Sequence, residues 1–325
     1  MLPIVAALCL MLGYDSFTGF LCCTISCGFG FAGAITNPFT VLLASRLIGV
    51  NPLEHIWLRI VVFAVMFALL QGFLFLYVRR LRKDPGSSLT QAHDEELRAL
   101  GMAEGESDPA QEKRARRVYA VFLLVALALI IGCSLSPALR DYTVVVLIAY
   151  FLLAGIGAGI LVSGELRKVL KSFGRGFVAA LPTLVFIALA ASLKYVLTES
   201  AVLPTIVHQI DRLTAGKSVW TIAIVIYLIV LLLEFFISSS TAKAILLMGL
   251  LAMVNTGLSK QMLVLLYTFG DGYTNVLFPT SPVLLLSLSM IGVDYFTWVK
   301  KSLPLFIVNL ILVIGFILLG VAVHY

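Results

Sequence analysis

Long charge-free apolar stretches are the feature that most limits how this chain can fold. Seven stretches of 18 to 30 residues contain no Asp, Glu, Lys or Arg. About 20 apolar residues in a helix suffice to cross the hydrocarbon core of a bilayer. The seven stretches are 16–45, 60–78, 118–139, 142–164, 176–193, 272–293 and 302–325. They predict an all-α, polytopic membrane protein.

The amount and position of charge support this class. Only 12% of the 325 residues are charged, whereas a soluble domain has about 25%, so a soluble enzyme is excluded as the leading interpretation. Residues 79–117 hold 17 of the 40 charged residues. This segment is predicted to be a cytoplasmic linker, partly helical around 91–101. The net charge of +6 then reflects basic anchoring on the inner side, and no nucleic acid partner is expected.

The cysteines predict neither disulfides nor a metal site. All five lie in apolar runs, and three of them, Cys22, Cys23 and Cys27, are close together. A transition-metal site usually needs four ligands, often including His, and none of the four histidines is nearby in sequence. The cysteines are therefore interpreted as small residues that pack between helices.

Two shorter apolar runs, 218–233 and 244–259, flank the segment from Glu234 to Lys243. The positions of Lys and Arg require that this pair enters and leaves the membrane on the same, outer side. A re-entrant hairpin over 218–259 and two short spans both satisfy that requirement. A helix of 16 residues is about 24 Å long, less than the roughly 30 Å of the hydrocarbon core, so length favours a hairpin with its tip at Ser238–Thr241.

An internal repeat relates the two ends of the chain. In residues 28–59 and again in 270–300, Gly, Thr, Asn and Pro interrupt a span, which then resumes as an apolar helix. The resumed helices end in matching sequences, Gly49-Val50-Asn51 before Trp57 and Arg59, and Gly292-Val293-Asp294 before Trp298 and Lys300. In the predicted topology, the first of these two segments runs outward through the membrane and the second runs inward. This pattern indicates an inverted-repeat transporter with broken helices near the midplane.

Polar groups at such breaks can bind ions or solutes. Pro and Gly free backbone groups from the helix ladder, and these are tolerated at membrane depth where protein or a wet cavity surrounds them. Charge there is usually functional. Asp271 could bind a coupling cation, carry a proton, attract a cationic substrate or cap a half-helix. Lys243 could bind a substrate carboxylate or pair with Glu234. The alternative is that the breaks are Pro kinks that only aid packing.

Three motifs carry a resemblance to a known family: GFGFAGAITNPFT (28–40), FFISSSTAKA (235–244) and YTFGDGYTNVLFPTSPVLLLSL (267–288). They resemble the YfcC family, relatives of the anaerobic C4-dicarboxylate carriers (DcuC-like) in the ion transporter superfamily. The resemblance covers most of the chain except 79–117. It implies an elevator-type secondary transporter of the bacterial inner membrane, not an enzyme. At the hairpin tip, Ser238 stands where the family commonly has Pro, and Thr241-Ala242 where it has Ser-Gly.

The resemblance also implies the site. Its substrate- and ion-binding residues match Thr36, Asn37, Pro38, Thr40, Ser238, Ser239, Ser240, Thr241, Lys243, Asp271, Thr274, Asn275, Thr280 and Ser281. The substrate would be an amino acid, a peptide-like solute or a C4-dicarboxylate, moved by exchange or with Na+ or H+. Sodium would use the same carbonyl and hydroxyl groups, and no other cofactor is expected. A passive channel or a non-transporting truncated protein is the alternative function.

The resemblance divides the chain into three parts. Residues 118–325 form the second repeat, with the hairpin at 218–259, and 79–117 the linker. Residues 1–78 match the end of a first repeat that is incomplete at its N-terminus, with 1–14 as the returning arm of its hairpin. The expected partners are the lipid bilayer, a small-molecule substrate, and a second copy of the chain or a separate chain that supplies the missing part.

Overall fold

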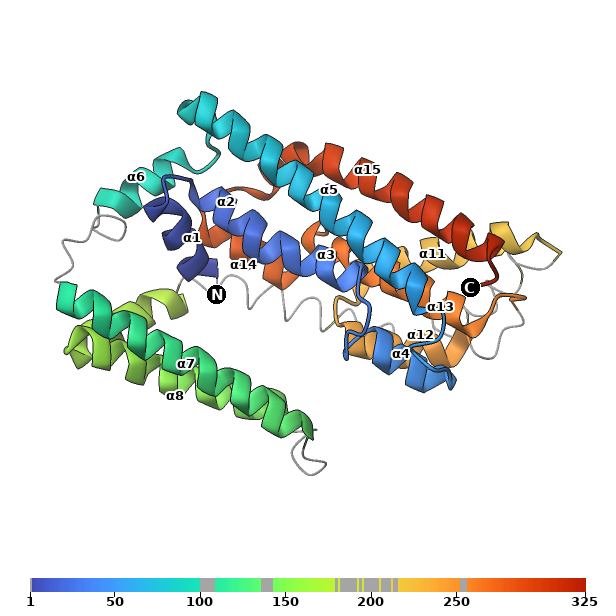
Figure 1. Ribbon diagram of the computed structural model, residues 1–325, viewed down its shortest axis with the longest axis horizontal. Helices are drawn as coiled ribbons and strands as arrows, with labels where there is room; N and C mark the ends of the chain where they lie inside the picture. Colours follow the sequence, from blue (N-terminus) through green and yellow to red (C-terminus); the bar gives the residue numbers. More distant parts are fainter. Residues whose placement is uncertain are drawn as a thin grey trace. The chain divides into compact units, whose positions relative to one another are not determined.

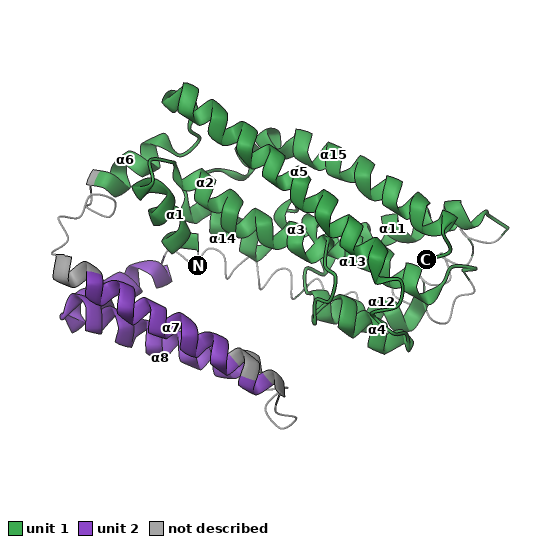
Figure 2. Ribbon diagram, viewed as in Figure 1, with its two compact units in different colours: residues 1–103, 183–325 green, residues 104–182 purple. Residues whose placement is uncertain are grey.

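A computed structural model describes residues 2–99, 109–135, 143–178, 216–251 and 256–325, together with a few isolated positions. The described residues are helical throughout, apart from turns and connections. They form two compact units, residues 1–103 with 183–325, and residues 104–182 (Figure 2). Most of the predicted span 176–193 lies outside the described residues.

Four of the described helices are long and apolar enough to cross a membrane. They are α5 (Ile56–Lys83), α8 (Thr143–Ser163), α11 (Val219–Phe236) and α15 (Tyr295–Ala322). The predicted all-α, multi-pass class is therefore confirmed. Many large apolar side chains on these helices are exposed, as expected of surfaces that face lipid.

The predicted span 16–45 consists of two helices separated by a break, as the predicted interruption requires. Helix α1 (Leu2–Met11) precedes a continuous helix made of α2 (Ser16–Phe20), a π-helical turn η1 (Leu21–Ile25) and α3 (Ser26–Ala32). Asp15 caps its start by accepting a hydrogen bond from the Thr18 backbone N–H, at 2.9 Å. The chain leaves the helix at Gly33 and resumes as α4 (Val41–Ile48). The break predicted around Asn37 and Pro38 is thus present.

The second broken helix begins earlier than the charge-free stretch 272–293 predicts. Its first half is α13 (Lys260–Asp271), followed by a 3-10 turn η4 (Tyr273–Val276) and α14 (Pro282–Met290). The charge-free stretch excludes Asp271, but the predicted repeat over 270–300 includes it at the break. Asp271 is the last residue of a buried half-helix, with no exposed surface.

The interruption predicted between the two short runs lies at residues 237–239, between α11 and α12 (Ser240–Leu251). Helix α11 extends to Phe236 and is 18 residues long, so length alone does not require this arm to turn back inside the membrane. Both α11 and α12 pack against α13, and α4 lies along α12 and α13 (Figure 1). Re-entry of this segment stays a prediction.

Much of the charged linker is helical. Helix α5 runs on to Lys83, a 3-10 turn η2 covers Pro85–Ser87, and α6 (Gln91–Ala99) matches the helix predicted around 91–101. The Asp94 carboxylate of α6 is buried and accepts hydrogen bonds from the Ser16 backbone N–H at 3.1 Å and the Thr90 hydroxyl at 2.7 Å. His93 packs against Gly292. Helix α6 therefore contacts the start of the first broken helix and the end of the second.

We expect Asp94→Ala to lower the free energy of unfolding by about 1–3 kcal/mol, because two donors lose a buried, charged acceptor. Glu96→Ala is the matched control, since Glu96 is an exposed acid on the same helix. Thermal unfolding of the detergent-solubilised variants measures the difference. Equal stability of the two variants would show that α6 is not anchored through Asp94.

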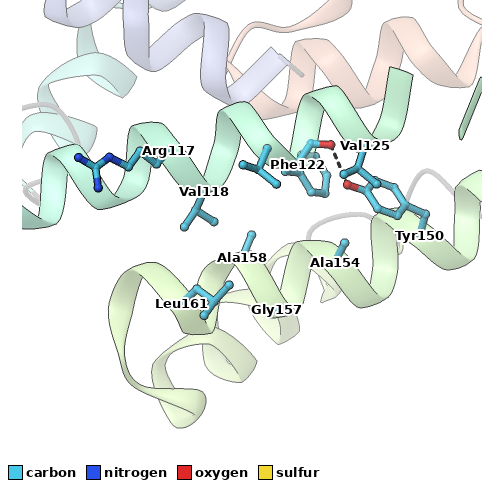
Figure 3. A pocket seen from close by; sticks show the side chains of 10 residues that line it. Arg117, Val118, Phe122, Val125, Tyr150, Ala154, Gly157, Ala158 and Leu161 are labelled. Atoms are coloured by element: carbon cyan, nitrogen blue, oxygen red, sulfur yellow. Dashed lines mark hydrogen bonds between the residues drawn. The ribbon is translucent and has the colours of Figure 1, made fainter. Parts of the chain in front are cut away.

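The second unit, residues 104–182, is built on α7 (Pro109–Leu135) and α8. The Tyr150 hydroxyl of α8 donates to the Phe122 carbonyl of α7 at 2.7 Å, and the two rings stack. A cavity of about 420 Å³ lies between these helices (Figure 3). Apart from Arg117 and Tyr150 its lining is apolar or glycine, so it suits hydrocarbon rather than a polar solute.

Candidate functional site

The two helix breaks meet in the first unit. Helix α3 ends at Ala32, α13 ends at Asp271, and Gly272 follows. A Cβ atom on Gly272 would overlap the backbone nitrogen and Cα of Ala32. Only glycine allows two backbones to approach this closely. The end of the half-helix before the first break therefore contacts the turn of the second break.

A second close approach supports this contact. A Cβ on Gly28 would lie 2.7 Å from the Val276 side chain, so α3 also packs tightly against η4. The indole N–H of Trp298 donates to the Val276 carbonyl at 3.0 Å. The turn after Gly272 is thus held between the first broken helix and the start of α15.

Three ionisable side chains from three helices meet beside the second break. The Lys243 ammonium of α12 lies 2.6 Å from the Asp271 carboxylate of α13 and also contacts the Glu234 carboxylate of α11. All three side chains are at most 1% exposed. Such burial of charge is costly unless the charges are paired and hydrogen-bonded. The pairing with Glu234, one of the two roles proposed for Lys243, is confirmed and extends to Asp271.

Local sequence explains how this triad (Glu234, Lys243 and Asp271) is placed. Residues three apart share a helix face, so Ser240 and Lys243 both reach Asp271 from the first turn of α12. The Ser240 hydroxyl donates to the Asp271 carboxylate at 2.7 Å. Asp271 lies at the C-terminus of α13, where the helix dipole disfavours a negative charge. Ser240 and Lys243 therefore supply the stabilisation that its own helix does not.

The other polar residues of the second break bond to backbone. The Asn275 side-chain amide donates to the Asp271 carbonyl at 2.6 Å, and the Thr274 hydroxyl to the Gly270 carbonyl at 2.7 Å. Both carbonyls end α13 and would otherwise lack partners. The Thr280 hydroxyl is buried without a hydrogen-bond partner in the described part of the chain. Ser281 is buried at the start of α14.

The tip residues between α11 and α12 have different surroundings. Among the described tip residues, Ser240 contacts the triad. The Ser239 hydroxyl accepts from the Ala242 N–H at 3.4 Å, as a helix cap would. Ser238 is half-buried, and Thr241 is exposed on the first turn of α12.

The first break lies around a separate cavity of about 270 Å³. Its lining residues are Gly30, Ala34, Ile35, Thr36, Asn37 and Phe63, with none from the second break. Thr36 and Pro38 are exposed, and the Asn37 side chain accepts from the Phe39 N–H at 2.8 Å. Thr40 is fully buried, and its hydroxyl has no hydrogen-bond partner among the described residues. The structure thus divides the predicted site residues between two neighbourhoods.

Arg59 is a further candidate that the sequence pattern marked only as the counterpart of Lys300. It is 3% exposed, and its guanidinium donates to the Ala34 carbonyl at 3.4 Å, beside the first break. It also lies over the Tyr325 ring. Among the described residues no carboxylate pairs with it. The signal that could have identified it is a single charge at the start of α5, directly before the charge-free stretch 60–78.

Comparisons with known proteins identify the family of the chain. The family model described as "DcuC: C4-dicarboxylate anaerobic carrier" matches residues 1–322. A protein of Escherichia coli K12 described as "Putative basic amino acid antiporter YfcC" is 29% identical over 98% of this chain. An uncharacterized protein of Haemophilus influenzae is 24% identical over 99% of it. The chain spans 65% and 62% of the lengths of these relatives. No solved structure matches it.

Proposed function

Because this chain belongs to the DcuC family of C4-dicarboxylate anaerobic carriers, a family of transporters and not of enzymes, we propose that it is a secondary active transporter. It moves a small organic solute across the bacterial cytoplasmic membrane, either coupled to an ion or by exchange. The observation that carries the proposal is the contact between two helix breaks at Ala32 and Gly272, next to the buried triad.

We propose an inverted repeat that works as an elevator. In support, the helix order is the same on both sides: a half-helix, a break, a second half-helix and then a long helix. The long helices α5 and α15 are both 28 residues long. The predicted topology gives the two halves opposite directions, which is the arrangement found in inverted-repeat transporters.

The solute that we propose carries a carboxylate. The family description names C4-dicarboxylates and one relative's name mentions basic amino acids, and both classes carry this group. Arg59 supports the assignment, since a buried guanidinium suits a carboxylate and Arg59 has no carboxylate partner in the described part of the chain.

We further propose a homodimer as the working assembly.

Uptake into proteoliposomes tests the function. We expect saturable accumulation of a labelled basic amino acid or C4-dicarboxylate that depends on a proton or sodium gradient or on a counter-substrate inside. A passive channel would equilibrate the solute without accumulating it. If neither solute class is taken up above protein-free vesicles, the proposal fails.

Asn275→Ala tests whether the second break belongs to the transport site. We expect uptake to fall about 3- to 10-fold, which corresponds to one lost hydrogen bond of about 0.5–1.5 kcal/mol. Ser289→Ala is the control, because Ser289 is an exposed hydroxyl residue on α14. Uptake by Asn275→Ala equal to that of the control would remove Asn275 from the site.

A further inference from the structure

The triad does not balance its own charge. Glu234 and Asp271 carry two negative charges when ionised, and Lys243 carries one positive charge. The phenol group of Tyr267 on α13, which lies near Lys243, is neutral when protonated. One negative charge is therefore left over in a place that is at most 1% exposed.

No other described cation compensates the surplus. Among the described elements, α13, α15 and η4 pack against α11, and α12 reaches it through Lys243. The ionisable groups of η4 and of the buried end of α13 are Tyr273, Tyr267 and Asp271. Tyr273 contacts Tyr227, hydroxyl to hydroxyl. Helix α15 has no ionisable residue between Ser302 and Ala322. Its two lysines before that stretch, Lys300 and Lys301, form no ion pair with the triad.

A buried, unbalanced charge costs several kcal/mol and is usually removed by a proton or a bound ion. A metal ion shared by the two carboxylates would have to sit between them, and the Lys243 ammonium already lies there. Sodium also needs several oxygen ligands, as other hard cations do. A proton needs only one oxygen.

The hydrogen bonds decide which carboxylate takes the proton. Asp271 is stabilised as an anion by two donors, the Lys243 ammonium and the Ser240 hydroxyl at 2.7 Å. Apart from its ion pair with Lys243, neither oxygen of Glu234 receives a hydrogen bond from any described residue. Fewer donors to a carboxylate favour its protonated form. The site of the proton is therefore Glu234.

We propose that Glu234 binds one proton from the aqueous phase and releases it during each transport cycle, so that the proton is the coupling ion. The inference rests on the proposed transport function. With Glu234 protonated, Lys243 and Asp271 remain as a neutral ion pair. When the proton leaves, the triad carries one negative charge. The net charge of the site therefore depends on whether the proton is bound, and this dependence links proton binding to the transport cycle.

Two kinds of transport assay separate coupling from solute binding. Glu234→Gln copies the neutral, protonated side chain. In proteoliposomes we expect accumulation driven by a pH gradient to fall at least about tenfold, equivalent to about 1.4 kcal/mol, while exchange of external for internal solute falls much less. Glu165→Gln is the matched control, because Glu165 is exposed after the end of α8. Full gradient-driven accumulation by Glu234→Gln would overturn the proposal.

Infrared difference spectroscopy gives a readout that does not need transport. Between alkaline and acidic buffer, the reconstituted protein should show the band of a buried, protonated carboxyl group. We expect this band to be absent from Glu234→Gln and to shift when glutamate carboxyls are isotope-labelled. A band that persists in this variant, or that shifts with labelled aspartate instead, would overturn the assignment. If the band behaves as expected but no solute is transported, the proposed function fails and the proton site stands.

Discussion

Replacing Gly272 by alanine is expected to prevent the first unit from packing and to abolish uptake. The added Cβ would overlap backbone atoms of Ala32, and a backbone cannot rotate away as a side chain can. Inserting a methyl group into a packed interior typically costs about 1–3 kcal/mol and occasionally more. We expect a cost at the upper end of this range, because the two helix breaks would have to separate.

Gly72→Ala is the matched control. Gly72 lies within α5, and a Cβ there would have no neighbour within 4 Å. Alanine is more favourable than glycine in a helix by about 1 kcal/mol, so this variant should be at least as stable as the original protein. Thermal unfolding and proteoliposome uptake measure both variants. A Gly272→Ala protein as stable and active as the control would show that the two breaks do not touch.

The helix breaks were predictable from sequence because their signals are local. Pro38 cannot donate a backbone hydrogen bond and disfavours helix just before it. Gly272 marks the second break in a similar way, and the N-cap role of Asp15 follows from its position before an apolar run. Each of these signals acts within a few residues and does not depend on the rest of the fold.

The partners of the charged residues were less predictable because they come from tertiary packing. Counting charge-free stretches placed a boundary at Asp271, although Lys243 and Ser240 keep this residue inside the protein. The charged linker shows the same limit of prediction from sequence. Helix α6 is rich in charge, yet Asp94 is buried against the N-terminus of α2. In both cases a distant donor decides whether an acidic residue is buried.

The largest effect is expected at Lys243. Lys243→Met would remove the only cation that contacts both Glu234 and Asp271 in the described part of the chain. Breaking a buried ion pair by removing one partner typically costs about 3–5 kcal/mol. We expect a loss of this size in thermal unfolding, together with loss of uptake. Lys260→Met is the matched control, because Lys260 is exposed at the start of α13.

A triple variant separates folding from function. Lys243→Met combined with Glu234→Gln and Asp271→Asn leaves the triad with no charge, and an uncharged replacement of a buried ion pair is often neutral or stabilising. We expect it to regain most of the stability lost in Lys243→Met while uptake stays absent. A triple variant no more stable than Lys243→Met would show that the loss comes from the missing side-chain volume. Unpaired negative charge in the triad would then not be its cause, and the charge assignment of the triad would be wrong.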